Sequence, residues 1–436
     1  MSGYFVKTFG CRASQADGAG LEAGLASRGF SAASSVSDAD LVVLNTCTVT
    51  ATADDELRQT VRRIHRNQPA ARIVVTGCYA QRAAEEIAAL PGVTLVVGNS
   101  HKNSIPDLIG EGQQYHGEIR IGDIFEQRDF LSAPVEDALG DRTRPNLKIQ
   151  DGCNNRCSFC IIPYVRGRSR SSHADSVIDQ VRRLASKYRE VVLSGINLGR
   201  WGRDLEGGAR LVDLIRRLLD ETSVERLRLS SVEPMDWSDA LLELVACSPR
   251  IAKHVHAPLQ SGSDKVLRRM HRKYRPRHYA GRILKARELM PDCAVGADVM
   301  TGFPGESEEE FEESRAFIES LPFTYLHVFT YSARPGTPAA ADAQVPLDVR
   351  KRRTHTLRGL AAAKSRAFRQ SMVGRTLSAV TIEDGRIALS GNYLKVVLAR
   401  PREANRIEDF LIGGITGDDT ALCEAGTPLH LPPILQ

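Results

Sequence analysis

The sequence predicts an α/β protein built from a parallel α/β domain, a partial (β/α)6 barrel and a small all-β barrel. First, short apolar runs alternate with amphipathic helical patterns as far as residue 345, which is typical of parallel strands joined by helices. Second, a basic helical stretch occupies 350–369, and third, short strand patterns with glycine turns follow it. We place the parts at residues 1–110, 140–345, 346–369 and 370–436.

In the first part, three units each read as a strand, a cysteine and a helix. The strand-and-cysteine runs are 4–11, 41–47 and 72–78. Helical patterns follow them to about residue 28, over 54–65 and over 80–90, and a fourth apolar run lies at 93–97. Residues 101–140 read as a linker with one or two small strands.

The second part repeats the strand-and-helix unit six times, fewer than the eight of a closed (β/α)8 barrel, so we expect an open barrel. Right-handed crossovers place the C-terminal end of every strand on one rim. The predicted strands are 147–150, 191–195, 226–232, 254–258, 294–300 and 325–331. The predicted helices are 176–187, 211–219, 240–247, 279–290 and 308–320.

The third and fourth parts indicate contact with RNA. Residues 350–369 hold eight Lys or Arg residues and no Asp or Glu. Such a run supplies phosphate contacts, and we take Arg350, Lys351, Arg352 and Arg353 as candidates. The alternative is a solvated connector helix.

Composition narrows the class of protein. No apolar run approaches the ~18 residues of a membrane span, so we expect no membrane partner. The N-terminal residues lack the pattern of a signal peptide, so we expect a cytoplasmic protein. Because the cytoplasm is reducing, the nine cysteines are expected to be metal ligands or free thiols rather than disulfides. A net charge of +5 permits a nucleic-acid partner without requiring one.

The most specific pattern is C-x3-C-x2-C, formed by Cys153, Cys157 and Cys160 just after the first barrel strand. Three thiolates can hold three irons of a [4Fe–4S] cluster and leave the fourth iron open to a small molecule. The alternative is structural zinc, which takes four ligands, and no fourth cysteine follows closely.

A second set, Cys11, Cys47 and Cys78, has no local spacing rule. Each cysteine follows a predicted parallel strand, where the ligand sites of open α/β sheets gather. If the strands are neighbours, the three thiols converge and can hold another cluster. The alternative is three buried core cysteines. The remaining cysteines, Cys247, Cys293 and Cys423, are predicted to be core residues.

These motifs together resemble the methylthiotransferase branch of the radical S-adenosylmethionine (SAM) superfamily over nearly the whole chain. The residues that carry the resemblance are Thr8-Phe9-Gly10-Cys11, Asn45-Thr46-Cys47-Thr48-Val49-Thr50, Val75-Thr76-Gly77-Cys78, Lys148-Ile149-Gln150-Asp151-Gly152-Cys153, Pro258-Leu259-Gln260-Ser261-Gly262-Ser263, Gly302-Phe303-Pro304-Gly305-Glu306 and Tyr331-Ser332-Ala333-Arg334-Pro335-Gly336-Thr337. The C-terminal part is similar to the TRAM domain, an RNA-binding β-barrel. The run after Cys47 resembles the subfamily that acts on N6-threonylcarbamoyladenosine in tRNA.

The resemblance implies two [4Fe–4S] clusters, SAM as cosubstrate and tRNA as partner. On Cys153, Cys157 and Cys160, one cluster would cleave SAM to a 5′-deoxyadenosyl radical, which takes hydrogen from C2 of the modified adenine 3′-adjacent to the anticodon. On Cys11, Cys47 and Cys78, the other would present the methylated sulfur that joins this carbon. The chain would also need an electron donor, flavodoxin-like or equivalent, and a sulfur source. No general acid–base dyad is required, and we assign no catalytic side chain.

We expect SAM to lie across the rim at the strand C-termini. The candidate contacts are Phe159, Ser194, Gly195, Asn197, Ser231, Glu233, Gln260 and Phe303. Arg166, Arg168 and Arg170, just after the cysteine loop, are candidates to neutralise a carboxylate or phosphate; the alternative is a solvated basic loop.

Three other functions stay open at this point. An isopentenyladenosine tRNA methylthiotransferase would use the same chemistry on a different adenosine. A third subfamily modifies an aspartate of a ribosomal protein. A non-enzymatic RNA-binding module would contain zinc and no iron.

Overall fold

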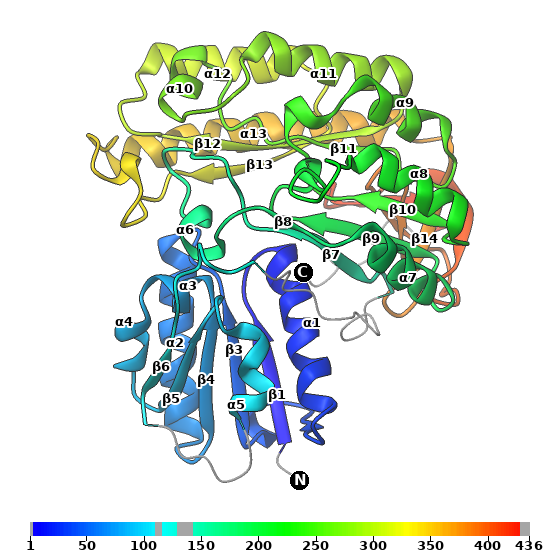
Figure 1. Cartoon of the computed structure of the whole chain (residues 1–436). Coiled ribbons are helices and arrows are strands. Elements are labelled where there is room, and N and C mark those ends of the chain that lie inside the picture. The colour runs from blue at the N-terminus through cyan, green and yellow to red at the C-terminus, as the bar shows by residue number, and fades with distance from the viewer. Residues whose placement is uncertain (1–2, 110–115, 129–142, 428–436) are drawn as a thin grey trace.

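The computed structural model describes residues 3–109, 116–128 and 143–427. Figure 1 shows an N-terminal α/β part, a central part whose helices cover one side of its strands, and C-terminal strands beside the central part. The predicted fold class is confirmed. Within these ranges, no helix combines the length and the apolar composition that a membrane span requires.

The N-terminal part is a six-stranded parallel sheet in the order β2-β1-β3-β4-β5-β6. Its strands are β1 (Gly3–Thr8), β2 (Ser31–Ala32), β3 (Leu41–Thr46), β4 (Arg72–Gly77), β5 (Val93–Gly98) and β6 (Glu118–Arg120). Its helices are α1 (Arg12–Ala26), α2 (Ala51–Asn67), α3 (Cys78–Arg82), α4 (Ala84–Ala88) and α5 (Ile105–Leu108). The single helix predicted over 80–90 is wrong, because Ala83 leaves the helical region at φ −144° and ψ 58°.

The central part contains six parallel strands, as predicted, and they form an open arc. They are β7 (Asn146–Asp151), β9 (Glu190–Gly195), β10 (Arg226–Leu229), β11 (His254–His256), β12 (Ala294–Thr301) and β13 (Tyr325–Thr330). A parallel bridge between Leu227 and Ile251 joins the two halves of the arc. The short strand β8 (Arg170–Ser171) is antiparallel to β7 and was not predicted.

Helices cover the outer face of this arc. They are α7 (Ala174–Ala185), α8 (Leu211–Glu221), α9 (Asp239–Cys247), α10 (Asp264–Arg269), α11 (Pro276–Leu289) and α12 (Glu308–Ser320). The short helix α6 (Ile162–Arg166) packs instead against α3 of the N-terminal part. Every second residue of the strands of the arc, for example Leu193, Val255 and Val295, points outward and packs with the helices in the largest apolar core. Because side chains alternate along a strand, the residues between them point to the inner face of the arc, and this face is polar. Asp298, for example, lies on this inner face.

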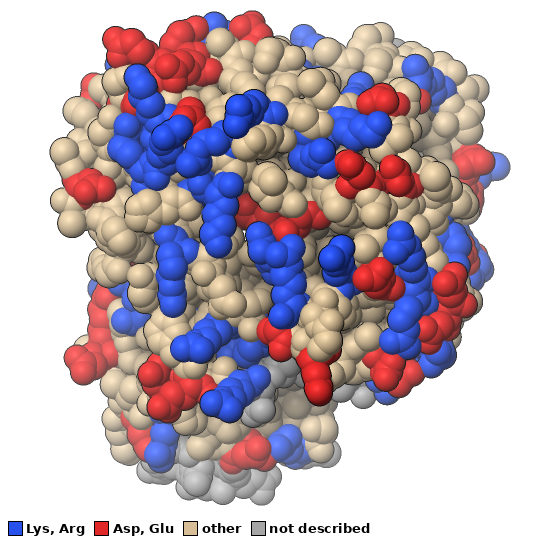
Figure 2. Space-filling view, turned by 45° about the horizontal axis from the view of Figure 1, so that its top comes forward, with Lys and Arg blue, Asp and Glu red and all other residues tan. Residues whose placement is uncertain are grey.

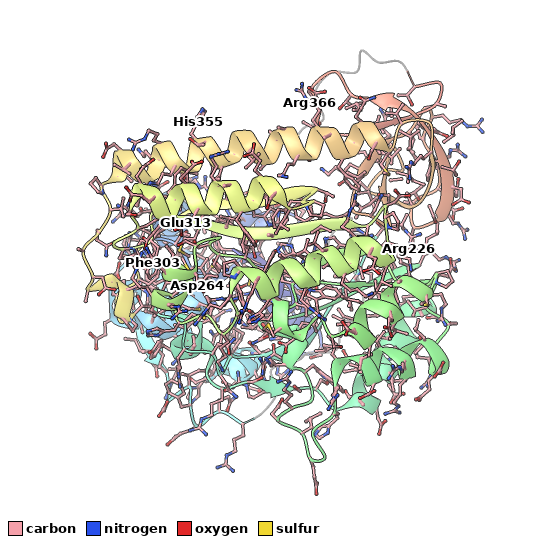
Figure 3. The ribbon with its side chains drawn as sticks, turned by 90° about the horizontal axis from the view of Figure 1, so that it is seen from above. Arg226, Asp264, Phe303, Glu313, His355 and Arg366 are labelled. Atoms are coloured by element: carbon pink, nitrogen blue, oxygen red, sulfur yellow. The ribbon has the colours of Figure 1, made fainter. Side chains whose placement is uncertain are left out.

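The C-terminal part begins with α13 (Leu347–Ser371), which Figure 3 shows running beside α12 toward the last strands. The strands form a closed barrel in the order β14-β15-β16-β18-β17. They are β14 (Thr376–Ile382), β15 (Ile387–Ser390), β16 (Lys395–Val397), β17 (Ile407–Ile415) and β18 (Leu422–Glu424). Asn392 Nδ2 donates to the carbonyl of Asp292, just before β12, and Asn405 Oδ1 accepts from the N–H of Arg189, just before β9, both at 3.0 Å, so this barrel docks at the N-terminal ends of the central strands.

The three cysteines outside the two sets divide differently from the prediction. Cys293 and Cys423 are buried, as predicted. Cys247 is exposed, so its prediction as a core residue is wrong. It is the last residue of α9, where the helix end turns toward solvent.

Candidate metal centres

The loop that carries Cys153, Cys157 and Cys160 begins where β7 ends. Gly152 takes φ +68°, and a Cβ atom there would collide with the carbonyl of Arg168, so only glycine fits. The Cys153 N–H donates to the carbonyl of Gly167 at 3.1 Å, and the Cys160 N–H donates to that of Cys157 at 3.1 Å. The loop therefore folds back on itself and holds the three cysteines on one turn.

Several donors point at the sulfur atoms of this loop. The backbone N–H of Asn155 and the Nδ2 of Asn197 lie 3.4 and 3.6 Å from Cys153 Sγ. Arg272 Nη1 lies 3.4 Å from Cys157 Sγ. Burial raises the pKa of the Cys160 thiol to about 12, so bound metal must displace its proton. Free thiols surrounded by amide and guanidinium donors suit an anionic metal–sulfur cluster.

Arg272 is a site residue that the sequence did not reveal. It forms an ion pair with Glu233, and its guanidinium carbon lies 4.8 Å from the centre of the Tyr274 ring. Tyr274 in turn donates to the carbonyl of Leu259 at 2.7 Å. Arg272 thus ties Cys157 to the ends of two barrel strands. Only its place beside the Gln260-Ser261-Gly262-Ser263 segment in the sequence offered a signal.

Gln150 is a second residue that was missed. Its Nε2 donates to the carbonyls of Asp151 and Gly152 at 2.9 and 2.8 Å. Its Oε1 accepts from the backbone N–H of Asn197 at 2.6 Å. A single buried amide therefore fixes the start of the cysteine loop against the end of β9. A polar residue inside an otherwise apolar strand was the available signal.

The predicted SAM contacts separate into two groups. Asn197 and Glu233 lie at the cysteine loop, through Cys153 and Arg272. The rings of Phe159 and Phe303 meet edge to face at 6.5 Å. The other four residues are Ser194, Gly195, Ser231 and Gln260, and for them the structure gives mainly structural contacts. Ser194 Oγ lies 3.5 Å from the carbonyl of Leu147, and a Cβ at Gly195 would meet Gln150 Cβ at 2.9 Å.

Gln260 and Ser231 lie at the ends of their segments. Gln260 takes φ +62°, and its backbone N–H donates to the carbonyl of Asp298 at 2.8 Å. Ser231 is half-buried just after β10. Among the described residues, neither side chain forms a hydrogen bond with the three cysteines, so their SAM contacts stay predictions.

Convergence of the N-terminal cysteines requires that the strands before them are neighbours. β1, β3 and β4 are adjacent and parallel, so this condition is met. A Cβ atom on Gly10 would meet Cys47 Sγ at 2.8 Å, so glycine lets the chain pass close to that sulfur. The pKa of the Cys47 thiol is raised to about 12, mainly by burial, with the neighbouring Cys78 and Cys11 thiols adding to the effect. The structure therefore brings the three thiols together, with Cys11 the most exposed.

Helix α6 links the surroundings of the two cysteine sets. This helix directly follows Cys160, and its Val165 packs against Cys78. Asn99 Nδ2 bridges the two sides, lying 2.7 Å from the carbonyl of Val165 and 3.6 Å from Cys78 Sγ. Residues far apart in the sequence thus place both sets at one junction between the N-terminal and central parts.

A buried ionic network also crosses this junction. Two carboxylates and three cations are almost fully inaccessible: Asp17, Asp151, Lys102, Lys148 and Arg166. Arg166 lies 2.9 Å from Asp17 and 3.0 Å from Asp151, and Lys102 lies 2.8 Å from Asp17. Lys148 pairs with Asp17 and lies 2.8 Å from Asp151. With one cation in excess, the network places positive charge beside the cysteines.

This network decides the role of the basic run after the cysteine loop. Arg166 was a candidate to neutralise a carboxylate, and it does so, but the carboxylates are those of Asp151 and Asp17 in the same chain. Arg170 is buried and donates to the carbonyl of Arg166 at 2.7 Å. Arg168 is exposed.

The predicted RNA-binding residues at the start of α13 do not form one surface. Lys351 and Arg352 are exposed, whereas the stem of Arg350 packs over Gly302. Arg353 is buried and lies 2.8 Å from Glu306, so its prediction as a phosphate contact is wrong. Helical periodicity turns it inward with Leu357 and pairs it with a buried carboxylate.

Comparisons with known proteins place this architecture. The model described as "Uncharacterized protein family UPF0004" matches residues 3–98, and the Radical SAM superfamily model matches residues 147–318. The threonylcarbamoyladenosine tRNA methylthiotransferase MtaB of Bacillus subtilis (strain 168) is 40% identical over 82% of this chain and 82% of its own length. That of Aquifex aeolicus (strain VF5) is 36% identical over 93% of this chain and 99% of its length.

Two further similarities widen the comparison. The tRNA-2-methylthio-N(6)-dimethylallyladenosine synthase of Desulforamulus reducens is 34% identical over 86% of this chain and 83% of its own length. Among solved structures, the radical S-adenosylmethionine methyltransferase TsrM from Kitasatospora setae superimposes with a TM-score of 0.54 at 16% identity, over 78% of this chain and 77% of TsrM. The latter likeness establishes a shared fold.

Proposed function

Because the chain belongs to the radical S-adenosylmethionine methylthiotransferase family, we propose that it converts the C2–H bond of N6-threonylcarbamoyladenosine in tRNA to C2–SCH3. The target is the adenosine 3′-adjacent to the anticodon. The structural observation that carries this proposal is the meeting of two three-cysteine sets at the α6 junction.

Each cysteine set fits a cluster with one open iron. Cys153, Cys157 and Cys160 would hold the first, and Cys11, Cys47 and Cys78 the second. When bound, the two clusters and SAM supply the electron, the radical and the methylated sulfur. The free thiols in both sets, and the donors aimed at Cys153, Cys157 and Cys78, support this assignment.

The chain's own residues position these groups and keep water away. Arg272 and Asn197 stabilise negative charge on the sulfurs of the first set. Gln150 fixes the loop that carries them. Phe159 and Phe303 provide apolar ring surface beside the loop, suited to the adenine of SAM. The pairing of Glu233 with Arg272 leaves that carboxylate at the rim, near Cys157.

Arg272→Lys is expected to slow reductive cleavage of SAM by about 10–100-fold, the usual effect of removing a support to a metal ligand. A lysine ammonium cannot contact Glu233 and Cys157 Sγ at once in the fork geometry of arginine. The measurement is 5′-deoxyadenosine formed by cluster-loaded protein. Arg268→Lys, at an exposed surface pair with Asp264, is the control. Equal rates for Arg272→Lys and the parent protein would contradict the assigned role.

For tRNA, we propose that the rim and the start of α13 contact phosphates. Figure 2 shows many Lys and Arg side chains across one face of the molecule, with smaller groups of Asp and Glu between them. At the rim, the Arg156 guanidinium lies over the ring of the exposed Tyr164 at 5.7 Å. Lys351 and Arg352 are exposed at the start of α13 and supply two further cations. We also propose that the C-terminal barrel acts as a TRAM-like RNA-binding module.

Lys351→Gln combined with Arg352→Gln is expected to weaken tRNA binding and lower the salt slope of log K by about 2, one for each lost phosphate contact. The measurement is a filter-binding titration at several salt concentrations. The matched control is Arg182→Gln with Arg183→Gln, an exposed adjacent pair on α7. An unchanged slope for the α13 pair would reject this part of the RNA surface.

The second candidate substrate is dimethylallyladenosine in tRNA, favoured by relatives such as the Desulforamulus reducens enzyme. Either reaction needs an electron donor, flavodoxin-like or equivalent, and a sulfur source, and we propose that it takes place in the cytoplasm. The direct test uses tRNA deuterated at C2 of the target adenine. Deuterium recovered in 5′-deoxyadenosine, together with a methylthio product, would support the reaction; a product without deuterium transfer would reject it.

A further inference from the structure

The inner face of the partial barrel carries a cluster of polar and aromatic side chains on β11, β12 and β13. Its members are His256, Asp298, Tyr325, His327 and Phe329, which we call the inner-face cluster. His256 Nδ1 lies 2.9 Å from Tyr325 Oη, and His256 Nε2 lies 3.2 Å from Asp298 Oδ2. His327 Nδ1 lies 3.1 Å from Asp298 Oδ1.

The cluster is anchored on its deep side and open on the other. The side chain of His256 is 8% exposed, whereas that of His327 is 49% exposed. Phe329, two residues further along β13, is 49% exposed and meets the His327 ring at 6.4 Å. Fixed hydrogen-bonding groups thus lie beneath an accessible imidazole and an accessible aromatic ring, an arrangement suited to a flat ring with a polar substituent.

Asp298 orders the cluster. Burial alone raises the pKa of a carboxyl, but the hydrogen bonds from His256 and His327 bring that of Asp298 well below its usual range. Asp298 is therefore an anion that accepts from His327 Nδ1. This bond selects the His327 tautomer with hydrogen on Nδ1, so its Nε2 is a hydrogen-bond acceptor for a ligand.

Arg12 of the N-terminal part contributes a cation to the site. Arg12 directly follows Cys11, and its Nη2 lies 3.4 Å from Tyr393 Oη of the C-terminal barrel. The Tyr393 and Tyr325 rings lie 5.5 Å apart, so this guanidinium adjoins the cluster. Asn146 Nδ2 donates to the Arg12 carbonyl at 2.7 Å and fixes its backbone. The site therefore lies next to the N-terminal cysteine set.

We propose that the inner-face cluster, with Arg12, binds the N6 substituent of the target adenosine, a group that bears a carboxylate and a hydroxyl. This inference rests on the proposed function and deepens it by naming the recognition site. The threonylcarbamoyl group carries a carboxylate for the guanidinium of Arg12 and a hydroxyl and urea for His327, whereas the Tyr325 hydroxyl is already held by His254 and His256 at 2.7 and 2.9 Å. A dimethylallyl group has no polar atoms and would offer no partner to the charge of Arg12 or to Nε2 of His327, which disfavours it.

A metal ion is the competing occupant, since ligand atoms of His256, Asp298 and His327 all lie within 4.8 Å of one another. Each Asp298 oxygen already faces one imidazole nitrogen, at 3.2 and 3.1 Å. Both nitrogens would have to turn from the carboxylate to a metal. The arrangement therefore favours an organic ligand that adds to the contacts already present.

The test compares the cluster-loaded protein bound to two forms of one tRNA, one with threonylcarbamoyladenosine and one with unmodified adenosine. We expect the parent protein to prefer the modified form. Arg12→Gln should reduce this preference by about 10–100-fold, the effect of a hydrogen bond to a charged group, and His327→Phe by about 2–10-fold, the effect of a neutral hydrogen bond. His355→Phe, on an exposed face of α13, is the matched control, and Figure 3 shows it on the side away from α12.

Binding and turnover answer different questions here. A parent protein that binds both tRNA forms equally, or variants that keep the preference, would overturn the recognition site. So would one equivalent of Mn²⁺ that binds the parent protein and is lost in His327→Phe. A preference for the modified tRNA without any methylthio product would instead overturn the proposed function and leave the recognition site standing.

Discussion

Cys47→Ala is expected to abolish methylthio transfer to tRNA while reductive cleavage of SAM continues. Cys47 belongs to the N-terminal set, whereas SAM is cleaved at the cluster assigned to Cys153, Cys157 and Cys160. The variant should lose one of two cubane clusters, so iron should fall from about eight to about four atoms per chain. Iron content, 5′-deoxyadenosine and methylthio nucleoside are to be measured on one preparation.

Two further cysteine variants serve as comparisons for Cys47→Ala. Cys157→Ala should lose both SAM cleavage and methylthio transfer, because both depend on the first set. Cys247→Ala, at the exposed end of α9, should keep both activities and all of the iron. If Cys47→Ala kept the iron content of the parent protein and its methylthio product, Cys47 would not be a ligand of a cluster that the reaction requires.

Asp17→Asn is expected to lower the free energy of unfolding by about 3–5 kcal/mol, the cost of breaking a buried ion pair. Asp17 pairs with Lys102, Lys148 and Arg166, and all four side chains are almost fully buried. An asparagine leaves these cations without their shared carboxylate. Urea unfolding followed by circular dichroism measures the change, and Asp107→Asn, at an exposed pair with Arg28, should change it by less than about 0.5 kcal/mol.

The same network predicts a pH dependence. Burial alone raises the carboxyl pKa, but Lys102, Lys148 and Arg166 hold the pKa of Asp17 well below its usual range. A carboxyl whose pKa is lowered by folding stabilises the protein above its unfolded pKa of about 3.9, and this is lost as the pH falls further. The parent protein should therefore lose stability below about pH 4 more steeply than Asp17→Asn. Parallel curves for the two proteins would contradict the role of the network.

Local patterns in the sequence predicted the strands and both cysteine sets, because each depends on neighbours in the chain or on parallel pairing. The cysteines that end β1, β3 and β4 converge since these strands are adjacent. The ionic network was out of reach, because Asp17 and Lys148 are 131 residues apart. No periodic pattern in the sequence links residues so far apart. A charged residue is therefore predicted to lie at the surface unless the position of its buried partner is known.

Two errors have a common physical cause. The run of basic residues predicts Arg353 to be a phosphate contact, yet the helical period places it on the buried face of α13 with Leu357 and Ala361. The helical pattern predicts Cys247 to be a core residue, yet α9 ends at that residue. In both cases the direction of one side chain, rather than the type of element, decided burial. The spacing of Leu357 and Ala361 was the signal that would have found Arg353.

The most direct test of the central claim is mass spectrometry of tRNA nucleosides from a host that lacks both tRNA methylthiotransferases and expresses this chain. We predict a methylthio group on N6-threonylcarbamoyladenosine and none on dimethylallyladenosine. A methylthio group on dimethylallyladenosine alone would contradict the substrate and the recognition site, while leaving the chemistry intact. Neither product, from protein that holds both clusters, would contradict the assignment as a tRNA methylthiotransferase.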